Sequence, residues 1–394
     1  MKQGWEEKRL GDVCKVIAGQ SPEGKYYNSS GNGLPFYQGK KEYGEKYIGE
    51  PRAWTTKITK EAEANDILMS VRAPVGPINF STQKICIGRG LAAIRASKLI
   101  DKEFLFNFLL KHENEIVGNS GAVFNSINKS QIENIEIPLP PLPEQKRIVT
   151  ILDKAFTAIA KAKDNAEQNL NNAKELFESY LQVVFENKGE GWEEKRFEGI
   201  IRINQIGLVR NSKEQGNDLK YRYVKMDAIS INNDFIEDKC VYVDASDQEV
   251  NKFKLDADDF LFNTRNSYEL VGKTCVYDPK SSEITLFNNN IMRVKFKKGI
   301  SSRFVNYAFS STLVKRDLEE LKSGTTSVVG IYFKGLRNLR IPITDIYTQQ
   351  TIVKNLDILS TKTKKLEAIY LQKVEDLEEL KKSVLQKAFN GELN

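Results

Sequence analysis

Residues 137–153 read IPLPPLPEQKRIVTILD, and residues 341–357 read IPITDIYTQQTIVKNLD. The two stretches correspond at one constant offset, and the match runs without a gap to the end of each copy, where Phe185 corresponds to Phe389. A second match lies nearer the start, because the hexapeptide GWEEKR occupies residues 4–9 and again residues 191–196. Self-similarity on this scale indicates two diverged copies of one unit, joined head to tail. A chain with two similar ends suits a target with two-fold symmetry, and duplex DNA is the commonest such target.

Each copy ends in one long predicted helix. In the first copy Pro143 fits the first helical turn, where its missing N–H costs nothing, and in the second copy Thr348 is suited to the N-cap. Beyond these positions neither segment contains Gly or Pro until Gly189 and Gly391. About 40 residues at 1.5 Å each predict rods roughly 60 Å long.

A repeating seam of small or apolar residues runs along both helices, at spacings that alternate between three and four. This period is typical of a coiled coil. In the first helix the seam includes Ile148, Leu152, Ala155, Ile159, Ala162, Ala166, Asn169, Ala173, Leu176, Tyr180 and Val184. In the second helix it includes Ile352, Leu356, Leu359, Thr363, Leu366, Tyr370, Lys373, Leu377, Leu380, Val384 and Ala388.

The two seams differ in side-chain size, since alanines in the first correspond to leucine or tyrosine in the second. A small seam facing a large one lets two helices approach closely and fill the space between them. We therefore expect the helices to pair with each other, antiparallel and within one chain, rather than each with its own copy in a dimer. The alternative is two independent helices, each lying on its own domain.

The remaining segments are rich in turn signals between short strand-like runs, such as residues 67–71 and 260–264. We expect one amphipathic helix in each copy, over residues 104–110 and from Phe304. The predicted fold class is α+β, with two α/β domains separated by the two paired helices and related by pseudo-two-fold symmetry. The predicted divisions are a first domain, a spacer helix, a second domain and a C-terminal spacer helix, at residues 1–142, 143–187, 188–346 and 347–394.

Composition sets broad limits on this chain. Its 394 residues suffice for two to three domains, and 40% hydrophobic with 28% charged residues is ordinary for a globular protein. The net charge of +6 permits a polyanionic partner without requiring one. Four cysteines lie far apart, without a Cys-x-x-Cys pair, and His112 is the sole histidine, so we expect neither a zinc site nor a disulfide framework. No apolar leader follows Met1 and no run of about 18 apolar residues occurs, which predicts a cytoplasmic protein.

Four motifs make the chain resemble the specificity subunit of a type I restriction–modification system over almost its whole length. They are GWEEKRLGDV at residues 4–13, GLPFYQG at 33–39, NDIL at 65–68 and, most specific of all, IPLPPLPEQKRIV at 137–149. The second copy departs from this pattern, because residues 341–350 lack the proline cluster and residues 197–200 lack the Leu-Gly-Asp-Val sequence.

The resemblance implies two target-recognition domains, each of which recognises one half of a split DNA sequence, and paired helices that act as spacer and docking surface. It also implies two methyltransferase subunits and two restriction subunits as partners. S-adenosylmethionine, ATP and Mg²⁺ are then expected on those partners and not on this chain.

Within this family setting, polar and basic loop residues are the candidates for DNA contact. Arg72 and Arg265 follow matched strand-like runs and suit bidentate contact with guanine or a phosphate, the alternative being an ion pair with a nearby carboxylate. Glutamine suits adenine, and lysine supplies salt-dependent phosphate affinity. The other candidates are Gln38, Lys40, Lys41 and Tyr43, with Arg222 and Lys225 as counterparts, Asn266 beside Arg265, and the small loops around Ser120, Gly121 and Asn125 and around Ser323 and Thr325.

Enzyme motifs are missing from the sequence, which has no phosphate-binding Gly-x-x-x-x-Gly-Lys-[Ser/Thr] loop, no Gly-x-Gly-x-x-Gly and no Asn-Pro-Pro-aromatic tetrapeptide. We therefore expect a recognition subunit without catalysis of its own. One alternative is an adaptor that spaces two protein-binding domains and has no salt-dependent DNA affinity. The other is a stand-alone endonuclease, which would cleave DNA with a metal ion.

Overall fold

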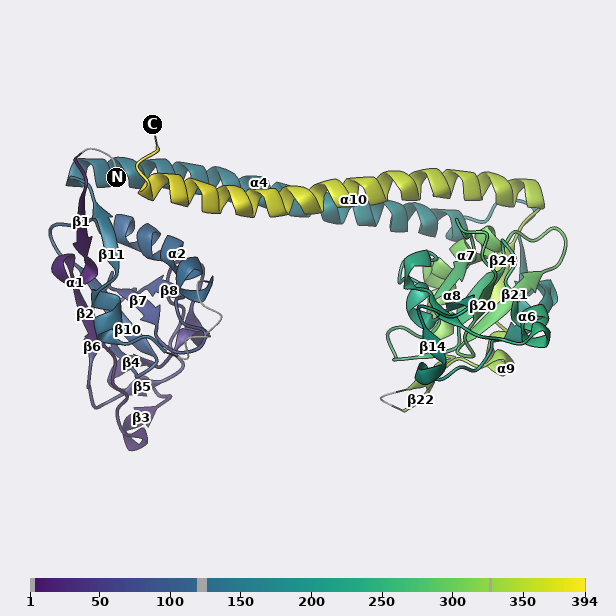
Figure 1. Cartoon of the computed structure of the whole chain (residues 1–394), viewed down its shortest axis with the longest axis horizontal. Coiled ribbons are helices and arrows are strands. Elements are labelled where there is room, and N and C mark those ends of the chain that lie inside the picture. The colour runs from purple at the N-terminus through teal and green to yellow at the C-terminus, as the bar shows by residue number, and fades with distance from the viewer. Residues whose placement is uncertain (1–3, 119–125, 326–327, 394) are drawn as a thin grey trace. The chain divides into compact units, whose positions relative to one another are not determined.

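The computed structural model describes residues 4–118, 126–325 and 328–393 and divides into two compact units. Unit 1 comprises residues 1–167 and 371–394, and unit 2 comprises residues 168–370. Each unit therefore contains one globular part together with a portion of each long helix, α4 (Leu142–Glu186) and α10 (Ile346–Phe389) (Figure 1). These helix bounds lie close to the predicted ones, while the division into recognition domains stays a prediction.

Unit 1 is built from short strands in three sheets. Its elements before α4 are β1 (Glu6–Arg9), α1 (Leu10–Val13), β2 (Cys14–Ala18), η1 (Gly24–Tyr26), β3 (Tyr27–Asn28), β4 (Leu34–Tyr37), η2 (Lys40–Glu42), β5 (Trp54–Thr55), β6 (Glu61–Ala62), β7 (Ile67–Ser70), β8 (Ile78–Phe80), β9 (Ile85–Ile87), β10 (Leu91–Ala96), α2 (Lys102–Gly118), α3 (Lys129–Glu133) and β11 (Glu136–Leu139). The sheet orders are β1-β11, β2-β10-β7-β8 and β3-β5-β4-β9-β6.

Unit 2 repeats this plan with local additions. Its elements between the long helices are β12 (Glu193–Arg196), α5 (Phe197–Ile200), β13 (Ile201–Ile206), η3 (Ser212–Glu214), β14 (Gln215–Gly216), β15 (Tyr221–Val224), η4 (Met226–Ala228), η5 (Glu237–Lys239), β16 (Val241–Val243), α6 (Asp247–Phe253), β17 (Phe260–Asn263), β18 (Arg265–Asn266), β19 (Thr274–Val276), β20 (Thr285–Phe287), β21 (Ile291–Phe296), α7 (Ser302–Ser310), α8 (Thr312–Glu319), β22 (Ser323–Gly324), β23 (Val329–Gly330), α9 (Phe333–Leu336) and β24 (Arg340–Ile343). The sheet orders are β12-β24, β13-β21-β17-β19, β14-β16-β15-β20 and β18-β23-β22.

An inner strand of each main four-stranded sheet, β7 or β17, contributes side chains to two cores, because successive side chains of a strand point to opposite faces. In β7, Ile67 and Met69 join the cluster that contains residues of α2 and the long helices, while Leu68 joins the cluster shared with the second sheet. In β17, Phe260 and Phe262 join the cluster that contains residues of α7 and the long helices. Burial on both faces explains why these runs are continuously apolar rather than alternating.

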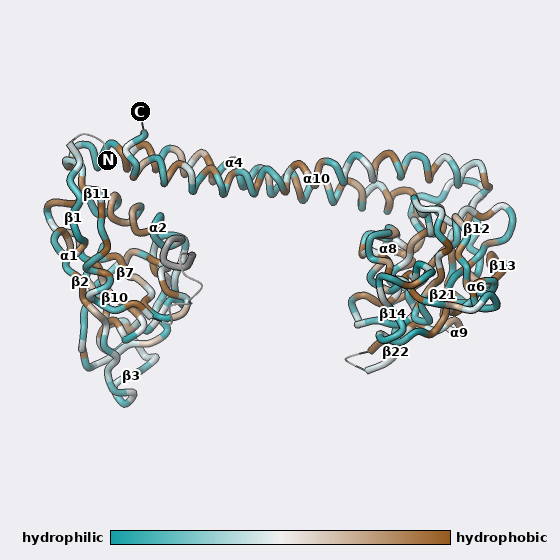
Figure 2. Tube along the Cα trace, in the orientation of Figure 1, coloured by the Kyte–Doolittle hydropathy of each residue, from teal (hydrophilic) through white to brown (hydrophobic). Residues whose placement is uncertain are grey.

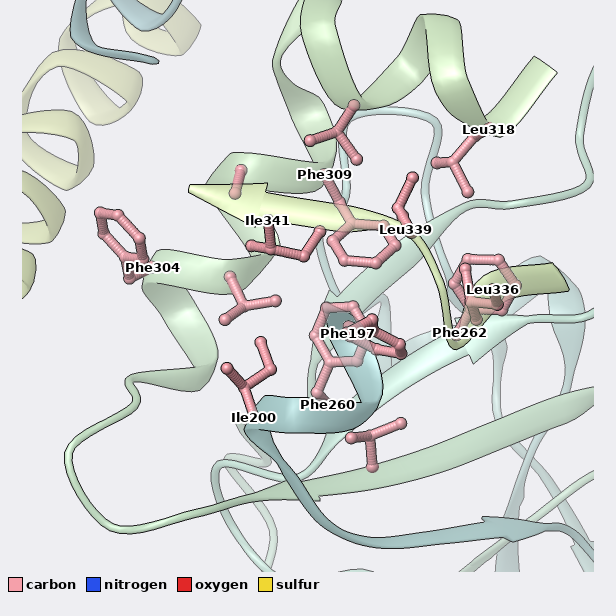
Figure 3. Packing of buried hydrophobic residues seen from close by; sticks show 14 of the residues in the cluster. Phe197, Ile200, Phe260, Phe262, Phe304, Phe309, Leu318, Leu336, Leu339 and Ile341 are labelled. Carbon is pink, nitrogen blue, oxygen red and sulfur yellow. The ribbon is translucent and has the colours of Figure 1, made fainter. Parts of the chain in front are cut away.

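The larger core of unit 2 contains a group of packed phenylalanine rings (Figure 3). Phe309 of α7 lies 5.3 Å from Phe197 and 5.2 Å from Phe260, measured between ring centroids. Both contacts are inclined, the arrangement that brings the edge of one ring toward the face of another. This core fixes α5 and α7 onto the main sheet, whose far ends carry the loops described below.

The long helices run antiparallel and pack together, as three contacts within unit 1 show. The Arg147 guanidinium donates to the carbonyl oxygen of Leu393, Lys381 lies over the ring of Phe156, and Lys163 pairs with Glu378. Residue numbers rise along α4 as they fall along α10, which defines an antiparallel pair. In unit 2 the second portion of α4 and the first portion of α10 share one core cluster. Hydrophobic and hydrophilic residues alternate along both helices, whereas hydrophobic residues gather in the strands of each globular part (Figure 2).

The predicted seam follows the buried face of α4 for the most part as far as Ala173. Ile148, Leu152, Ala166 and Ala173 are buried, and Ala155 and Ala162 are half-buried. Beyond Ala173 the buried residues are Leu181 and Phe185, with Phe177 half-buried, so the face advances in steps of four. The predicted Asn169, Leu176 and Tyr180 are exposed instead. Leu181 and Phe185 belong to the core of the globular part of unit 2, and Phe177 packs against it. The buried face of this end of α4 is therefore set by that core and not by a strict 3.5-residue repeat.

The second helix shows the same departure. Leu356 is buried, and Leu359, Tyr370 and Leu377 are half-buried. Leu366, predicted in the seam, is 39% exposed, and Leu380 is 47% exposed. Thr363 is buried, and its hydroxyl donates to the carbonyl oxygens of its own helix, so its polar group has partners there.

Candidate nucleic-acid interface

Several loops of unit 1 meet at one end of its sheets, and we call this the loop edge of unit 1. It comprises the residue after β4 (Gln38), the residues after β7 (Val71 and Arg72), and the β9–β10 turn (residues 88–90). Backbone hydrogen bonds join these segments. They run from the Gly88 N–H to the Tyr37 carbonyl oxygen (2.8 Å), from Val71 to Gly90 (3.0 Å) and from Ile127 to Val71 (3.0 Å).

Unit 2 has the same loop edge, formed by Lys225, residues 264–266 and the β20–β21 turn (residues 288–290). The matching hydrogen bonds run from the Asn288 N–H to the Val224 carbonyl oxygen (3.0 Å), from Thr264 to Asn290 (2.8 Å) and from Ile331 to Thr264 (2.9 Å). Gln38 and Lys225 therefore occupy equivalent positions, as do Arg72 and Arg265.

Arg72 and Arg265 are exposed at these two edges. Arg72 bridges Ser126 through its backbone, and the Arg265 guanidinium lies over the ring of Tyr332 at 5.8 Å. Among the described residues, neither arginine forms an ion pair with a carboxylate. The described part of the chain therefore gives no support to the alternative that these arginines serve in structural ion pairs. The face of an aromatic ring attracts a guanidinium, so Tyr332 favours this position of Arg265.

The small sheet β18-β23-β22 brings Arg265, Asn266 and Ser323 together, although the sequence separates them widely. Gly330 of β23 pairs with Arg265 on one side and with Ser323 on the other. The Asn266 side chain is used locally, since its amide donates to Asn263 and its oxygen accepts from the Ser267 N–H. Asn266 is therefore a structural residue of this edge rather than a free hydrogen-bonding group, while Ser323 and Thr325 are exposed.

In unit 1 the loop after Gln38 is only partly available. Gln38, Lys40 and Lys41 are exposed, with both lysines in η2. Tyr43 is half-buried, and its hydroxyl donates a 2.9 Å hydrogen bond to the Leu68 carbonyl oxygen. Burial raises the pKa of Tyr43 well above its ordinary value and keeps this donor protonated. Tyr43 therefore holds the loop onto β7, and its hydroxyl is not presented to a ligand.

Arg222 is also engaged within the fold. Its side chain is 13% exposed and forms an ion pair with Glu237, and a longer one of 3.3 Å with Glu283. Two carboxylates thus neutralise this guanidinium inside unit 2, so Arg222 lacks the exposed position expected of a DNA contact. A β-strand places alternate residues on opposite faces, and here the face of β15 that carries Arg222 is covered. Lys225, three residues further on, is half-buried at the loop edge.

Two groups of residues at these edges escaped the sequence analysis. Arg89 is exposed at the centre of the β9–β10 turn, between two glycines. A Cβ on Gly90 would lie 2.2 Å from the Gln38 carbonyl oxygen, so the Gly-Arg-Gly pattern was the available signal. In unit 2, Tyr332 and Tyr268 are about half exposed at 54% and 51%, and the ammonium group of Lys322 lies 4.4 Å from the Tyr268 ring centroid. Aromatic rings interleaved with cations are typical of nucleic-acid surfaces.

The predicted contacts Ser120, Gly121 and Asn125 lie outside the described residues. Within the described ranges no group of three or more His, Cys, Asp or Glu side chains is placed to bind a metal ion. In the same part of the chain, no helix combines the length and apolarity that crossing a membrane requires.

Comparison with known proteins agrees with this architecture. The model of the type I restriction modification DNA specificity domain matches residues 2–169 and again residues 189–376. The chain is 44% identical over 184 residues to the putative type I restriction enzyme MjaX specificity subunit of Methanocaldococcus jannaschii, a match that covers 45% of this chain and 43% of that relative. It is 24% identical over 407 residues to the MjaVIII specificity subunit of the same organism, covering 99% of this chain and 93% of the relative.

The fold also has a close solved counterpart. A chain from a structure of a type I restriction–modification system superimposes with a TM-score of 0.80 at 20% identity, covering 100% of this chain and 99% of that one. The fold of this chain therefore matches that of the solved chain along almost its whole length. The chain belongs to the family of type I restriction–modification specificity subunits, and it carries two copies of their DNA specificity domain.

Proposed function

We propose that this chain selects the DNA target of a type I restriction–modification complex by recognising a bipartite site, one half with each loop edge. The observation that carries this proposal is the repeated edge itself. In each unit an exposed arginine, Arg72 or Arg265, stands beside a rigid turn at the same end of the sheets. Exposed cations beside polar side chains combine phosphate affinity with the capacity for base contacts.

The long helices serve as spacer and as docking surface in this proposal. DNA half-sites must be met by recognition elements at a defined separation and phase, and long helices without internal Gly supply stiffness. Along α4 in unit 2, Leu176, Tyr180 and Val183 are 52%, 38% and 50% exposed. Their spacing of four and three places them on one helix face. An apolar stripe of this kind suits a helix of a partner protein, and we assign it to a methyltransferase subunit.

In this proposal the chain contributes no catalytic residue. S-adenosylmethionine is bound by the methyltransferase subunits, and ATP and Mg²⁺ by restriction subunits where these are present. A non-catalytic adaptor and a stand-alone endonuclease are the competing functions. The first would show no salt-dependent DNA affinity in complex with its partners, and the second would cleave DNA as a purified chain with a divalent metal ion.

A genome-wide map of methylated bases tests the proposal. The map is made in cells with and without this gene, with the methyltransferase subunit present in both. We expect a motif of two short half-sites with a fixed gap to disappear on deletion. An unchanged map, with the methyltransferase subunit shown to be expressed, would contradict a role in target selection.

A further inference from the structure

The β9–β10 turn of unit 1 and the β20–β21 turn of unit 2 are one structure with different residues at the tip. Both are held by the same backbone hydrogen bonds, beyond those already given for the loop edges. In unit 1 these run from Leu91 to Gly88 (3.0 Å), from Gly19 to Leu91 (2.9 Å) and from Gln20 to Ile87 (3.0 Å). In unit 2 they run from Ile291 to Asn288 (2.9 Å), from Gly207 to Ile291 (3.1 Å) and from Leu208 to Phe287 (2.8 Å).

These bonds place Arg89 and Asn289 at equivalent positions, each at the centre of its turn. The residues on either side of these two positions have structural roles. In unit 1, glycine is required at position 90 because a side chain would collide with the Gln38 backbone. In unit 2 the buried side chain of Asn288 donates to the Tyr223 hydroxyl (3.0 Å) and accepts from the Asn290 N–H (2.8 Å).

In the described part of the chain, the side chains of Arg89 and Asn289 have no such structural role. Arg89 is exposed and Asn289 half-buried, and among the described residues neither side chain forms a hydrogen bond. Only their backbone N–H groups are engaged, with the Ser21 hydroxyl and the Leu208 carbonyl oxygen. Each turn therefore presents one free polar side chain on a rigid support.

The neighbouring arginines provide an internal comparison. Arg72 and Arg265 are identical in the two units, so they suit a feature shared by every DNA site, which is the phosphate backbone. Arg89 and Asn289 differ, so they suit the feature in which two half-sites differ, which is the bases. Arginine forms bidentate hydrogen bonds with the O6 and N7 atoms of guanine, and asparagine with the N6 and N7 atoms of adenine.

Building on the function proposed above, we propose that Arg89 and Asn289 are specificity-determining residues, Arg89 for a guanine in the half-site of unit 1 and Asn289 for an adenine in that of unit 2. Substitution of Arg89 or Asn289 changes base preference. It leaves the supporting turn intact, because neither side chain forms a hydrogen bond with a described residue.

The test uses the full chain in complex with its methyltransferase subunit and the motif obtained from the methylation map. Binding is measured for a panel of duplexes in which each base pair of the motif is changed singly. Arg89→Asn is expected to weaken binding to the original motif roughly 10- to 100-fold. It should also abolish discrimination at one G·C position of one half-site. Asn289→Arg should act on one A·T position of the other half-site.

Arg9→Asn is the matched control, since Arg9 is exposed on β1, which pairs with the strand that leads into α4. It should leave the panel unchanged. The assignment is overturned if Arg89→Asn binds as the original chain does, or if its binding falls by one factor on every duplex, which is the behaviour of a phosphate contact. If the original complex shows no preference for the motif, the proposed function fails before the variants are compared.

Discussion

Phe389 and Phe104 pack ring against ring in unit 1 at a centroid distance of 5.1 Å, although Phe389 is the last residue of α10 and Phe104 lies in α2. The equivalent pair in unit 2 is Phe185 and Phe304, at 5.4 Å. Phe185 is the last residue but one of α4, the helix of the first copy, and Phe304 lies in the second copy, so each copy buries its helix end in the globular part of the other.

This exchange makes the helix ends important for folding stability. Replacement of the buried Phe389 by alanine should lower the free energy of unfolding by about 3–5 kcal/mol, because it removes a large ring from a packed core. Urea unfolding followed by circular dichroism measures the change. Leu380→Ala, at an exposed position of the same helix, should change it by less than about 0.5 kcal/mol. Equal effects of the two substitutions would contradict the packing role of Phe389.

Gln145 and Gln349 each fasten the start of a long helix to its globular part, and both are fully buried. The Gln145 amide donates to the Pro140 and Leu99 carbonyl oxygens (2.8 and 3.2 Å) and its oxygen accepts from the Asp101 N–H (2.7 Å). Gln349 makes the matching bonds to residues 344, 299 and 301. Gln145→Ala or Gln349→Ala should cost about 1–3 kcal/mol in denaturant unfolding, because buried backbone groups lose their partners. Gln350→Ala, exposed beside Gln349, serves as the control and should be nearly neutral.

Ala166 is 1% exposed on α4, so we expect a larger side chain there to push against packed neighbours. Ala166→Leu should lower stability by about 1–3 kcal/mol through overpacking. Ala160→Leu adds the same atoms on the exposed face of the same helix and should not destabilise the protein. Identical melting temperatures for the two variants would refute the small-against-large pairing of the helices.

The lowered pKa of Glu237 predicts that the protein loses stability in acid. Burial raises the pKa of Glu237, but hydrogen bonds from Arg222 and from the backbone N–H groups of Lys280 and Ser281 outweigh it and lower the pKa below the ordinary 4.5. A lowered folded-state pKa stabilises the protein above the unfolded-state pKa, and this contribution is lost as the pH falls through the folded-state value. The stability advantage of the original chain over Glu237→Gln should therefore be full near neutral pH and shrink below about pH 4.5. An advantage that stays constant on acidification would exclude this linkage.

The exposed stripe on α4 predicts a binding defect without a folding defect. Replacement of Leu176, Tyr180 and Val183 by serine should change stability by only about 0.5 kcal/mol per site, because all three are surface positions of α4 outside the core. The same variant should bind the methyltransferase subunit more weakly in isothermal titration calorimetry. Glu178→Ser, an exposed polar position on the same helix, controls for general changes of the helix surface. Undiminished binding by the triple variant would place the docking surface elsewhere.

The repeat, the two long helices and their antiparallel pairing were all predictable from the sequence. Constant offsets, missing Gly and Pro and periodic apolar residues are local or pairwise properties of the chain, so they can be counted along it. The equivalence of Arg72 with Arg265 and of Gln38 with Lys225 was predictable for the same reason, since β7 and β17 carry the same apolar run.

The functions of single side chains were less predictable. Arg222 and Tyr43 are residue types expected in DNA contacts. In the structure, however, Arg222 forms an ion pair with Glu237, and the Tyr43 hydroxyl donates a hydrogen bond to the Leu68 carbonyl oxygen. These partners come from other elements, and no sequence pattern near Arg222 or Tyr43 indicates them. Arg89 was missed for the converse reason, since only the fold shows that its flanking glycines pack against the Gln38 backbone.

By itself, therefore, the sequence determined the number of copies, the two long helices with their pairing, and the family, because these depend on repetition and periodicity along one chain. The tertiary structure alone decided which helix end enters which core, where the buried face of each helix drifts from the seam, and which polar side chains remain free. Those outcomes depend on side-chain volume and on hydrogen-bond partners brought together from distant segments. Such contacts form only when the chain is folded, and the order of residues does not specify them one by one.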